Sequence, residues 1–245
     1  MPSSLGECLV IVGMMRMGID MEWPAVEREE RDGFRVTLFQ DECPTDPRED
    51  YDHYTTMYCA HRRYTLGDVQ LHADSDTGAV DGDAVVADIL AEGGAGTVVA
   101  NLYLYDHSGI TISMSAFGDP WDSGCVGVVA MTPAQLLAVD VVTDSPKHRL
   151  LTAYPNLLAM YARRHRARML EIMGQEVEEY DQYLTGDIYG YAVETAAGDY
   201  VDGCWGHYGY DYAWSEALAA LEYAVESARE TRDYLPQVPG LTYAS

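Results

Sequence analysis

The sequence predicts an α+β fold in which a mainly antiparallel sheet packs against two long helices. Three observations lead to this prediction. Short β-rich segments are separated by turns that contain Gly and Asp, and two long segments carry apolar residues at helical spacing. The strand and helix patterns also do not alternate regularly along the chain, as they do in proteins built from βαβ units.

Six segments are rich in β-branched and aromatic residues, and each is predicted to form a strand. They are residues 34–39, 97–105, 110–115, 126–131, 188–195 and 200–205. The tripeptide Ala197-Gly198-Asp199 separates the last two segments and supplies the residues that a tight turn requires. Residues 106–109 likewise separate two β-rich segments and predict a hairpin turn or a corner.

A first long helix is predicted over residues 156–184, because apolar side chains recur there at close to helical spacing. These side chains are Leu158, Tyr161, Met169, Met173, Val177, Tyr180 and Leu184. Asn156, which follows Pro155, is the expected N-cap, and Gly186 lies just past the expected end.

A second long helix is predicted over residues 212–234, with Pro236 just beyond its end. One face of this helix is apolar and carries Trp214, Leu218, Leu221, Val225 and Ala228. Acidic side chains occupy the rest of its surface. Two shorter helices are predicted over residues 84–92 and from Thr132-Pro133 onward.

The 245 residues are expected to form one domain overall, composed of three segments. Residues 1–55 are predicted to be an N-terminal segment with one strand, and residues 56–210 an α+β core. Residues 211–245 are predicted to be a C-terminal amphipathic helix and tail. Residues 74–96 are rich in Asp, Gly and Ala, and are expected to form a surface connection.

Acidic residues dominate the charge of the chain, with 40 Asp and Glu against 15 Lys and Arg and a net charge of −25. A chain of this charge repels phosphates, so direct binding of DNA or RNA is disfavoured. The acids are dispersed along the sequence and only one basic residue, Lys147, is a lysine, which fits a halophilic-like, carboxylate-rich surface. The same acidity also fits a protein that imitates nucleic acid.

The sequence predicts a cytoplasmic protein that is neither secreted nor bound to a membrane. No apolar run approaches the roughly 18 residues that span a bilayer. The mildly apolar N-terminus lacks a basic leader and contains Glu7, which argues against a secretory signal. The five cysteines are scattered without zinc-ribbon or CxxC spacing, so they are expected to be free thiols.

Five segments combine Gly, Asp and aromatic residues beyond what turns require. They read HRRYTLGD from His61, YDHSGIT from Tyr105, PWDSGCVG from Pro120, YLTGDIYG from Tyr183 and CWGHYG from Cys204. At these residues the chain resembles a family of uncharacterised proteins of bacteriophages and mobile elements, whose blocks are HRRYxLGD, YDHSGIT, PWDSGxVG, YLTGDxYG and CWGxYG. The resemblance spans residues 56–209 and implies a genetic context rather than an activity.

Four residues in two of these blocks are candidate catalytic residues. They are Asp106, His107, Asp119 and Asp122. If neighbouring loops bring them together, they form an acid–base or hard-cation site of a hydrolase. In the alternative interpretation, Asp106 satisfies turn amides, Trp121 anchors its loop in the core, and Asp122 caps local N–H groups.

Six further residues are candidates for binding. They are His61, Arg62, Arg63, Asp68, Asp187 and Trp205. The guanidinium groups of Arg62 and Arg63 either bind a phosphate or carboxylate or pair with internal acids. A zinc site that combines the Cys59-x-His61 and Cys204-x-x-His207 pairs is disfavoured, because the first spacing is too short for a zinc finger. No metal ligand is therefore predicted, and no motif indicates a cofactor.

The basic residues gather at a single point in the chain. They are Arg163, Arg164, His165, Arg166 and Arg168. Such a helix face either contacts RNA or an acidic partner, or pairs with acids from other elements while its apolar stems lie on the core.

Three functional hypotheses are compatible with these observations. The first is an accessory protein of a phage or mobile element that binds a host or viral protein. Imitation of nucleic acid by its acidic surface is one form of this hypothesis. The second is a small metal-dependent or acid–base hydrolase centred on the YDHSG and DPWDSG loops. The third is a structural or virion-associated protein whose acidity is a halophilic adaptation.

Overall fold

The computed structural model describes residues 24–72 and 80–234, which fold into two compact units of mixed helix and strand. This composition confirms the predicted α+β class. The N-terminal apolar run, Cys8, the start of the 74–96 connection and Pro236 lie outside the described residues.

The two units divide the chain differently from the single domain and three segments that the sequence suggests. Unit 1 combines the described residues up to Thr45 with those from Gly186 onward, and unit 2 runs from Asp46 to Thr185. The reason is a long-range strand pairing, in which a strand at residues 34–40 joins one at residues 188–195. The first 55 residues also contribute two strands to unit 1 rather than one.

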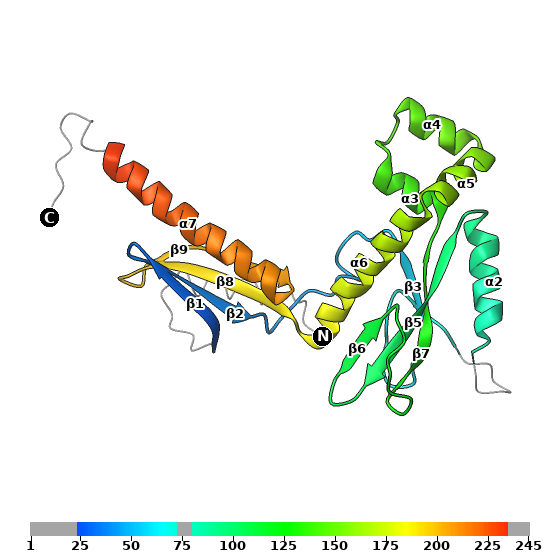
Figure 1. Ribbon diagram of the computed structural model, residues 1–245, viewed down its shortest axis with the longest axis horizontal. Coiled ribbons are helices and arrows are strands. Elements are labelled where there is room, and N and C mark those ends of the chain that lie inside the picture. Colours follow the sequence, from blue (N-terminus) through cyan, green and yellow to red (C-terminus); the bar gives the residue numbers. More distant parts are fainter. Residues whose placement is uncertain (1–23, 73–79, 235–245) are drawn as a thin grey trace. The chain divides into compact units, whose positions relative to one another are not determined.

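Unit 1 is a four-stranded antiparallel sheet with one long helix packed along it (Figure 1). In spatial order, its strands are β1 (Ala25–Arg31), β2 (Phe34–Gln40), β8 (Ile188–Thr195) and β9 (Tyr200–Tyr208). Helix α7 (Tyr210–Tyr234) follows β9 directly. Three predicted strands and the second predicted long helix are therefore confirmed.

The core of unit 1 follows from the alternation of side chains along its strands. Val36 and Leu38 of β2 and Val193 of β8 are fully buried on the face that α7 covers. The helix meets that face with small side chains, Ala213 and Ala217, which are also fully buried.

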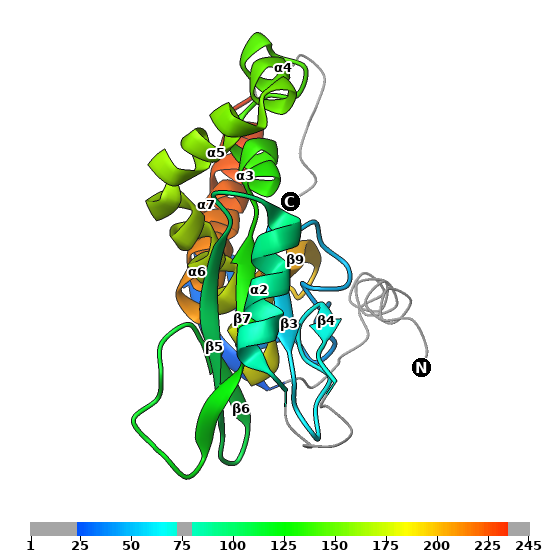
Figure 2. The same ribbon diagram turned by 90° about the vertical axis from the view of Figure 1, so that its right-hand side faces the viewer.

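Unit 2 contains a five-stranded sheet in the order β4-β3-β7-β5-β6 (Figure 2). Its strands are β3 (Thr56–Cys59), β4 (Val69–Gln70), β5 (Val98–Asp106), β6 (Ile110–Ser113) and β7 (Ser123–Met131). All neighbouring pairs are antiparallel except β3 with β4. The strands predicted over residues 97–105, 110–115 and 126–131 are thus confirmed, and residues 107–109 form the turn that joins β5 to β6.

One helix lies on each face of this sheet, α2 (Gly82–Gly93) on one side and α6 (Arg166–Thr185) on the other (Figure 1). Helices α3 (Pro133–Asp140) and α4 (Pro146–Ala153) pack on α5 (Pro155–Arg164), which packs on α6. Helix α6 packs Met169 and Met173 against one face, whereas Ile89 of α2 packs against Val128 and Ala130 on the other. No helix in the described part of the chain combines the length and apolar character needed to cross a bilayer.

The first predicted long helix is two helices, because the backbone leaves helical geometry at His165. This residue has φ −102° and ψ 20°, and its N–H group bonds the carbonyl oxygens of Tyr161 and Ala162. The expected N-cap at Asn156 is also wrong. Helix α5 begins at Pro155, its N-cap is Tyr154, and no side chain caps its start.

Candidate functional site

Loops at one end of the unit 2 sheet bring three of the five sequence blocks together. The first block follows β3, the second forms the β5–β6 turn, and the third leads into β7. Tyr105 of β5 pairs with Ser123 of β7, which sets the second block beside the third. We use the name Trp121 cluster for Arg62, Arg63, Asp106, His107, Trp121 and Asp122.

Backbone bonds fix the loops of the Trp121 cluster relative to each other. The N–H group of Asp106 donates to the carbonyl oxygen of Asp122 at 2.8 Å. Within the turn, the N–H group of His107 donates to the carbonyl oxygen of Gly109 at 3.0 Å. Ser108 between them lies in the left-handed region at φ 61°, as tight turns often require.

Two side-chain pairs join the loops of the cluster. Nδ1 of His107 lies 3.0 Å from Oδ2 of Asp122, and Arg63 forms an ion pair with Asp106. The His107 side chain is 63% exposed, so solvent reaches the ring. Asp106 and His107 are adjacent in sequence, yet each pairs with a residue from another loop. The candidate acid–base pair is therefore His107 with Asp122, and not His107 with Asp106.

Asp119 supports the third loop from within. Its Oδ1 atom accepts hydrogen bonds from the N–H groups of Trp121 at 2.8 Å and of Asp122 at 3.3 Å. The hydroxyl of Ser123 donates to the Asp119 carbonyl oxygen. Asp119 thus acts as a turn-stabilising residue here, and Ser123 is held by the loop backbone.

Trp121 points into solvent. Its side chain is 92% exposed, which is the highest exposure among the large apolar residues that the structure describes. The interpretation that Trp121 anchors its loop in the core is therefore wrong. The hydrogen bonds accepted by Asp119 hold the loop instead, so the loop does not depend on packing of the indole.

His61 borders the cluster and belongs to its scaffold. Its Nδ1 atom accepts hydrogen bonds from the N–H groups of Arg63 and Tyr64, at 3.3 and 3.2 Å. The ring stacks on Tyr64, with 4.8 Å between centroids. Burial lowers the pKa of His61, although the nearby Asp106 opposes this effect. A neutral His61 with Nδ1 accepting has its proton on Nε2, which makes it a hydrogen-bond donor.

All members of the Trp121 cluster except His107 line an open pocket of about 470 Å³. Guanidinium groups and carboxylates line this pocket together, so it offers both hydrogen-bond donors and acceptors. Arg62 makes no hydrogen bond or ion pair with any residue that the structure describes. An exposed indole beside an unpaired guanidinium group is an arrangement suited to binding a partner that carries a carboxylate or phosphate.

Asp68, a predicted binding residue, lies instead in a buried network of unit 2. Arg48 contacts Asp68 with Nε at 2.9 Å from Oδ1, and contacts Glu176 with one terminal nitrogen at 2.9 Å. The Arg48 side chain is 3% exposed. Asp68 also accepts the N–H group of Met57 at 2.7 Å, and Glu176 accepts that of Tyr54 at 2.7 Å. These bonds fasten the chain before β3 to helix α6.

The buried network was not predicted, because neither Arg48 nor Glu176 stands in a recognisable motif. A concave surface of about 270 Å³ opens beside it, and Glu179 lines that surface. Burial raises the pKa of Glu179, and the charge of Glu176 adds to this effect. Every terminal nitrogen of Arg48 already has a partner, so the network is structural.

Asp187 and Trp205, the remaining predicted binding residues, lie in unit 1. The carbonyl oxygen of Asp187 accepts the N–H group of Gly209 at 2.8 Å. The Trp205 ring lies against Gly190 and stacks on Phe39, with 6.4 Å between ring centroids. Both residues thus contribute to the packing of the β8–β9 hairpin.

The structure does not assemble the metal sites considered above. Within residues 24–72 and 80–234, no three His, Cys, Asp or Glu side chains lie close enough together to hold a metal ion. The Cys59–His61 pair belongs to unit 2, and the Cys204–His207 pair to unit 1. Cys59, Cys125 and Cys204 are free thiols.

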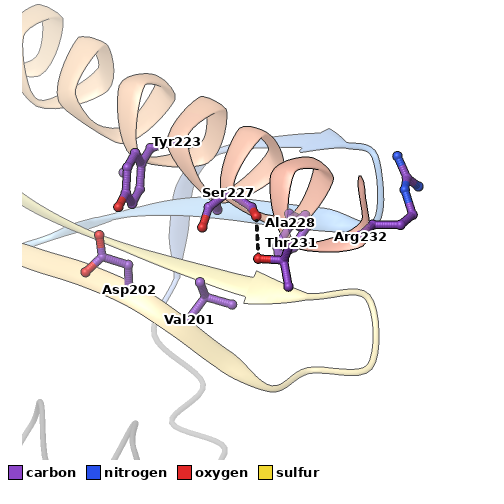
Figure 3. Close-up of a pocket in the computed structure, with 10 residues that line it drawn as sticks. Val201, Asp202, Tyr223, Ser227, Ala228, Thr231 and Arg232 are labelled. Atoms are coloured by element: carbon purple, nitrogen blue, oxygen red, sulfur yellow. Dashed lines mark hydrogen bonds between the residues drawn. The ribbon is translucent and has the colours of Figure 1, made fainter. Parts of the chain in front are cut away.

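A second concave surface lies in unit 1, between α7 and the edge strand β9 (Figure 3). We call it the α7–β9 groove, and its volume is about 550 Å³. Its lining includes Val201 of β9 and Ala220, Ala224 and Ala228 of α7. Tyr223 and Asp202 stand on opposite sides of it, as Figure 3 shows.

Comparisons of the chain with family models, with curated proteins and with solved structures found no match.

Proposed function

We propose that the chain is an accessory protein of a phage or mobile element, and that it acts by binding a host or viral protein through the Trp121 cluster. The observation that carries the binding role is the position of Trp121. Its side chain is 92% exposed, and it lines the same pocket as Arg62 and Arg63. The genetic context rests on the resemblance of the five sequence blocks.

The residue types of the cluster are those that dominate binding energy at protein interfaces. Trp and Arg are enriched among such residues, and truncating one typically costs 2 kcal/mol or more, on the order of a thirtyfold loss of affinity. Fully burying an aromatic side chain alone is worth about 1.5–3 kcal/mol. The free protein gains no such energy from Trp121, because the side chain is exposed. A partner that covers the indole would gain it.

The unpaired guanidinium group of Arg62 indicates the chemistry of the partner. An Arg side chain binds a carboxylate with two parallel hydrogen bonds, which fixes orientation as well as affinity. We therefore expect the partner to present an Asp or Glu side chain, or a chain-terminal carboxylate, next to an apolar surface that covers Trp121.

The excess of acid supports a second mode of protein binding, in which the chain imitates nucleic acid. Exposed carboxylates stand on β1 (Glu27 and Glu30) and on α7 (Glu226 and Glu230) of unit 1. A basic channel of a nucleic-acid enzyme would be attracted to such surfaces. Binding of this kind weakens steeply with salt, whereas binding centred on Trp121 does not.

Crosslinking from the proposed surface tests the binding role. A photoreactive amino acid placed at position 125, where the exposed Cys125 lines the same pocket, should capture a defined host or viral protein from infected cells. Trp121→Ala should abolish the capture and leave the thermal unfolding temperature unchanged. Leu90→Ala, on the exposed side of α2, is the matched control and should retain it. Equal capture by the Trp121→Ala protein would refute the assignment of this surface.

An acid–base hydrolase is the second candidate, and one contact favours it. The 3.0 Å separation of His107 Nδ1 and Asp122 Oδ2 would orient the imidazole as a general base for a water molecule. Hydrolysis of a panel of aryl esters and phosphodiesters should then be lost in His107→Gln and Asp122→Asn, and retained in Leu90→Ala. Absence of any turnover by the wild-type protein would exclude this candidate for those substrates.

A further inference from the structure

Helices α4 and α5 of unit 2 carry the largest group of exposed apolar side chains in the described part of the chain, and basic side chains stand among them. We call this surface the α4–α5 patch. It consists of Arg149, Leu150, Tyr154, Leu157, Met160, Arg163 and Arg164.

The arginines of the α4–α5 patch lack acidic partners, although the chain is rich in acids. Arg149, Arg163 and Arg164 have no carboxylate oxygen within 4.0 Å among the described residues. Arg168, one turn further on, pairs with Asp140 and with Glu171. The interpretation that this basic group pairs with acids of its own chain therefore holds only for Arg168.

Within α5, the apolar members of the patch share one side of the helix with Arg164. Leu157, Met160 and Arg164 are spaced by three and four residues, which places them on one face of the helix. Met160 is 64% exposed, and Tyr154 at the start of the helix is 57% exposed. The opposite face, with Ala159 and Ala162, is buried.

This combination of side chains fits a protein partner better than a nucleic acid. Phosphates would engage the arginines but would leave aliphatic side chains such as Met160 and Leu157 without contacts. A surface that combines apolar side chains with arginines is complementary to a protein surface that combines an apolar groove with carboxylates.

The chain itself offers a surface of that kind in the α7–β9 groove of unit 1. Its apolar lining consists of Phe34, Val201 and three alanines of α7, and its polar lining of Asp202, Tyr223, Ser227, Thr231 and Arg232. Glu226 and Glu230 stand one turn apart on the exposed side of α7, and neither has an ion pair with a described residue. Tyr223, in the same helix, is 71% exposed at the rim of the groove.

We propose that the α4–α5 patch of one molecule docks in the α7–β9 groove of a second copy. Leu157 and Met160 would enter the groove, while Arg163 and Arg164 would pair with Glu226 and Glu230. The two surfaces are different, so the contact is heterologous, and a dimer keeps one free α4–α5 patch at one end and one free α7–β9 groove at the other. Association is then head to tail and continues beyond the dimer.

The net charge of −25 opposes self-association at low ionic strength. At about 0.15 M salt the screening length is about 8 Å, which weakens repulsion between distant charges more than attraction across direct contacts. The head-to-tail contact should therefore be strongest at intermediate salt, and weaker both in dilute buffer and at about 1 M salt.

Sedimentation velocity of the full chain over a wide concentration range tests the proposal. The wild-type protein should form concentration-dependent oligomers at about 0.15 M salt. Met160→Asp and Arg164→Glu should each weaken association by about tenfold or more. Arg28→Glu reverses an exposed charge on β1 and is the matched control, which should associate like the wild type. A wild-type chain that remains monomeric at all concentrations would overturn the proposal.

Mixing two variants separates a head-to-tail contact from any other. Arg163→Glu/Arg164→Glu disables the patch, and Glu226→Arg/Glu230→Arg disables the groove, so each variant alone should be monomeric. An equimolar mixture has one intact pair of surfaces and should stop at a one-to-one dimer. A mixture that stays monomeric, while both variants unfold as cooperatively as the wild type, contradicts the proposal. A wild-type chain that stays monomeric and binds a single-stranded RNA oligonucleotide through Arg164 would also contradict the proposal.

Discussion

Arg48 and Asp68 form a bidentate ion pair inside unit 2, in which Nε of the guanidinium group lies 2.9 Å from Oδ1 of the carboxylate. The same guanidinium group also contacts Glu176 and the carbonyl oxygen of Thr55. One side chain thus joins the chain before β3, the turn before β4 and helix α6. The first loop of the Trp121 cluster, which runs from His61, ends at this anchored region in Asp68.

Removing the arginine from this network should destabilise unit 2 strongly. Arg48→Met leaves the buried carboxylates of Asp68 and Glu176 without their cation, which typically costs about 3–5 kcal/mol. Chemical denaturation followed by circular dichroism measures this loss. Arg168→Met removes a partly exposed pair and is the control, with an expected cost below about 1 kcal/mol. Similar costs for the two variants would contradict the structural role of Arg48.

Gly190 of β8 should tolerate no side chain, because a Cβ atom there would lie 2.5 Å from the ring of Trp205. Gly190→Ala should therefore displace the indole, destabilise unit 1 by about 1–3 kcal/mol and change the tryptophan fluorescence. Gly174→Ala, in helix α6, meets no atom within 4 Å. This control should raise stability by about 0.5–1 kcal/mol, since Ala favours helix. Unchanged fluorescence in Gly190→Ala would contradict the packing of Trp205 on β8.

His207 should make the stability of unit 1 depend on pH. Burial lowers the pKa of His207 in the folded state below its ordinary value of 6.5, against a smaller opposing effect of Glu216. As the pH falls through about 6.5, the unfolded chain binds a proton that the folded chain does not, so stability decreases. His207→Phe retains a ring against Tyr191 and should flatten this decrease. Urea denaturation between about pH 7.5 and 5.5 measures the free energy of unfolding of both proteins. The same dependence of this free energy on pH in the wild type and in His207→Phe would contradict the prediction.

Trp121→Ala should leave stability within about 0.5 kcal/mol of the wild type, because the side chain is 92% exposed. Leu102→Ala, at a fully buried position of β5, should cost about 2–5 kcal/mol. Thermal unfolding of the two variants compares these effects. A large loss in Trp121→Ala would show that the indole packs against the protein, and would weaken the case for a binding surface.

Most strands and helices could be predicted from the sequence, because their apolar periodicity is strong. Strand β1 was missed because its sequence is AVEREER, and as an edge strand it buries little of that polar surface. Strand β4 has only two residues and no pattern of its own. The break at His165 was missed because the apolar spacing continues from α5 into α6.

The candidate site was predicted in part. The blocks at Arg62, His107 and Asp122 do meet, since the turns that carry them end neighbouring strands. Local sequence could not show that Asp119 would hold the loop and leave Trp121 in solvent. Nor could it show that Asp68 would be buried with Arg48, because that pair depends on contacts between segments far apart in the chain.

The pairing of β2 with β8 has a consequence for synthesis of the chain. All of unit 2 lies between these strands, so β2 emerges from the ribosome long before its partner. At about 5–20 residues per second, the delay is roughly 7–30 s. Unit 2 is synthesised within that time and can fold before β8 is made, while the β1–β2 hairpin has one side unpaired. Slowed translation after Thr185 should therefore prolong exposure of β2 and favour aggregation of the nascent chain.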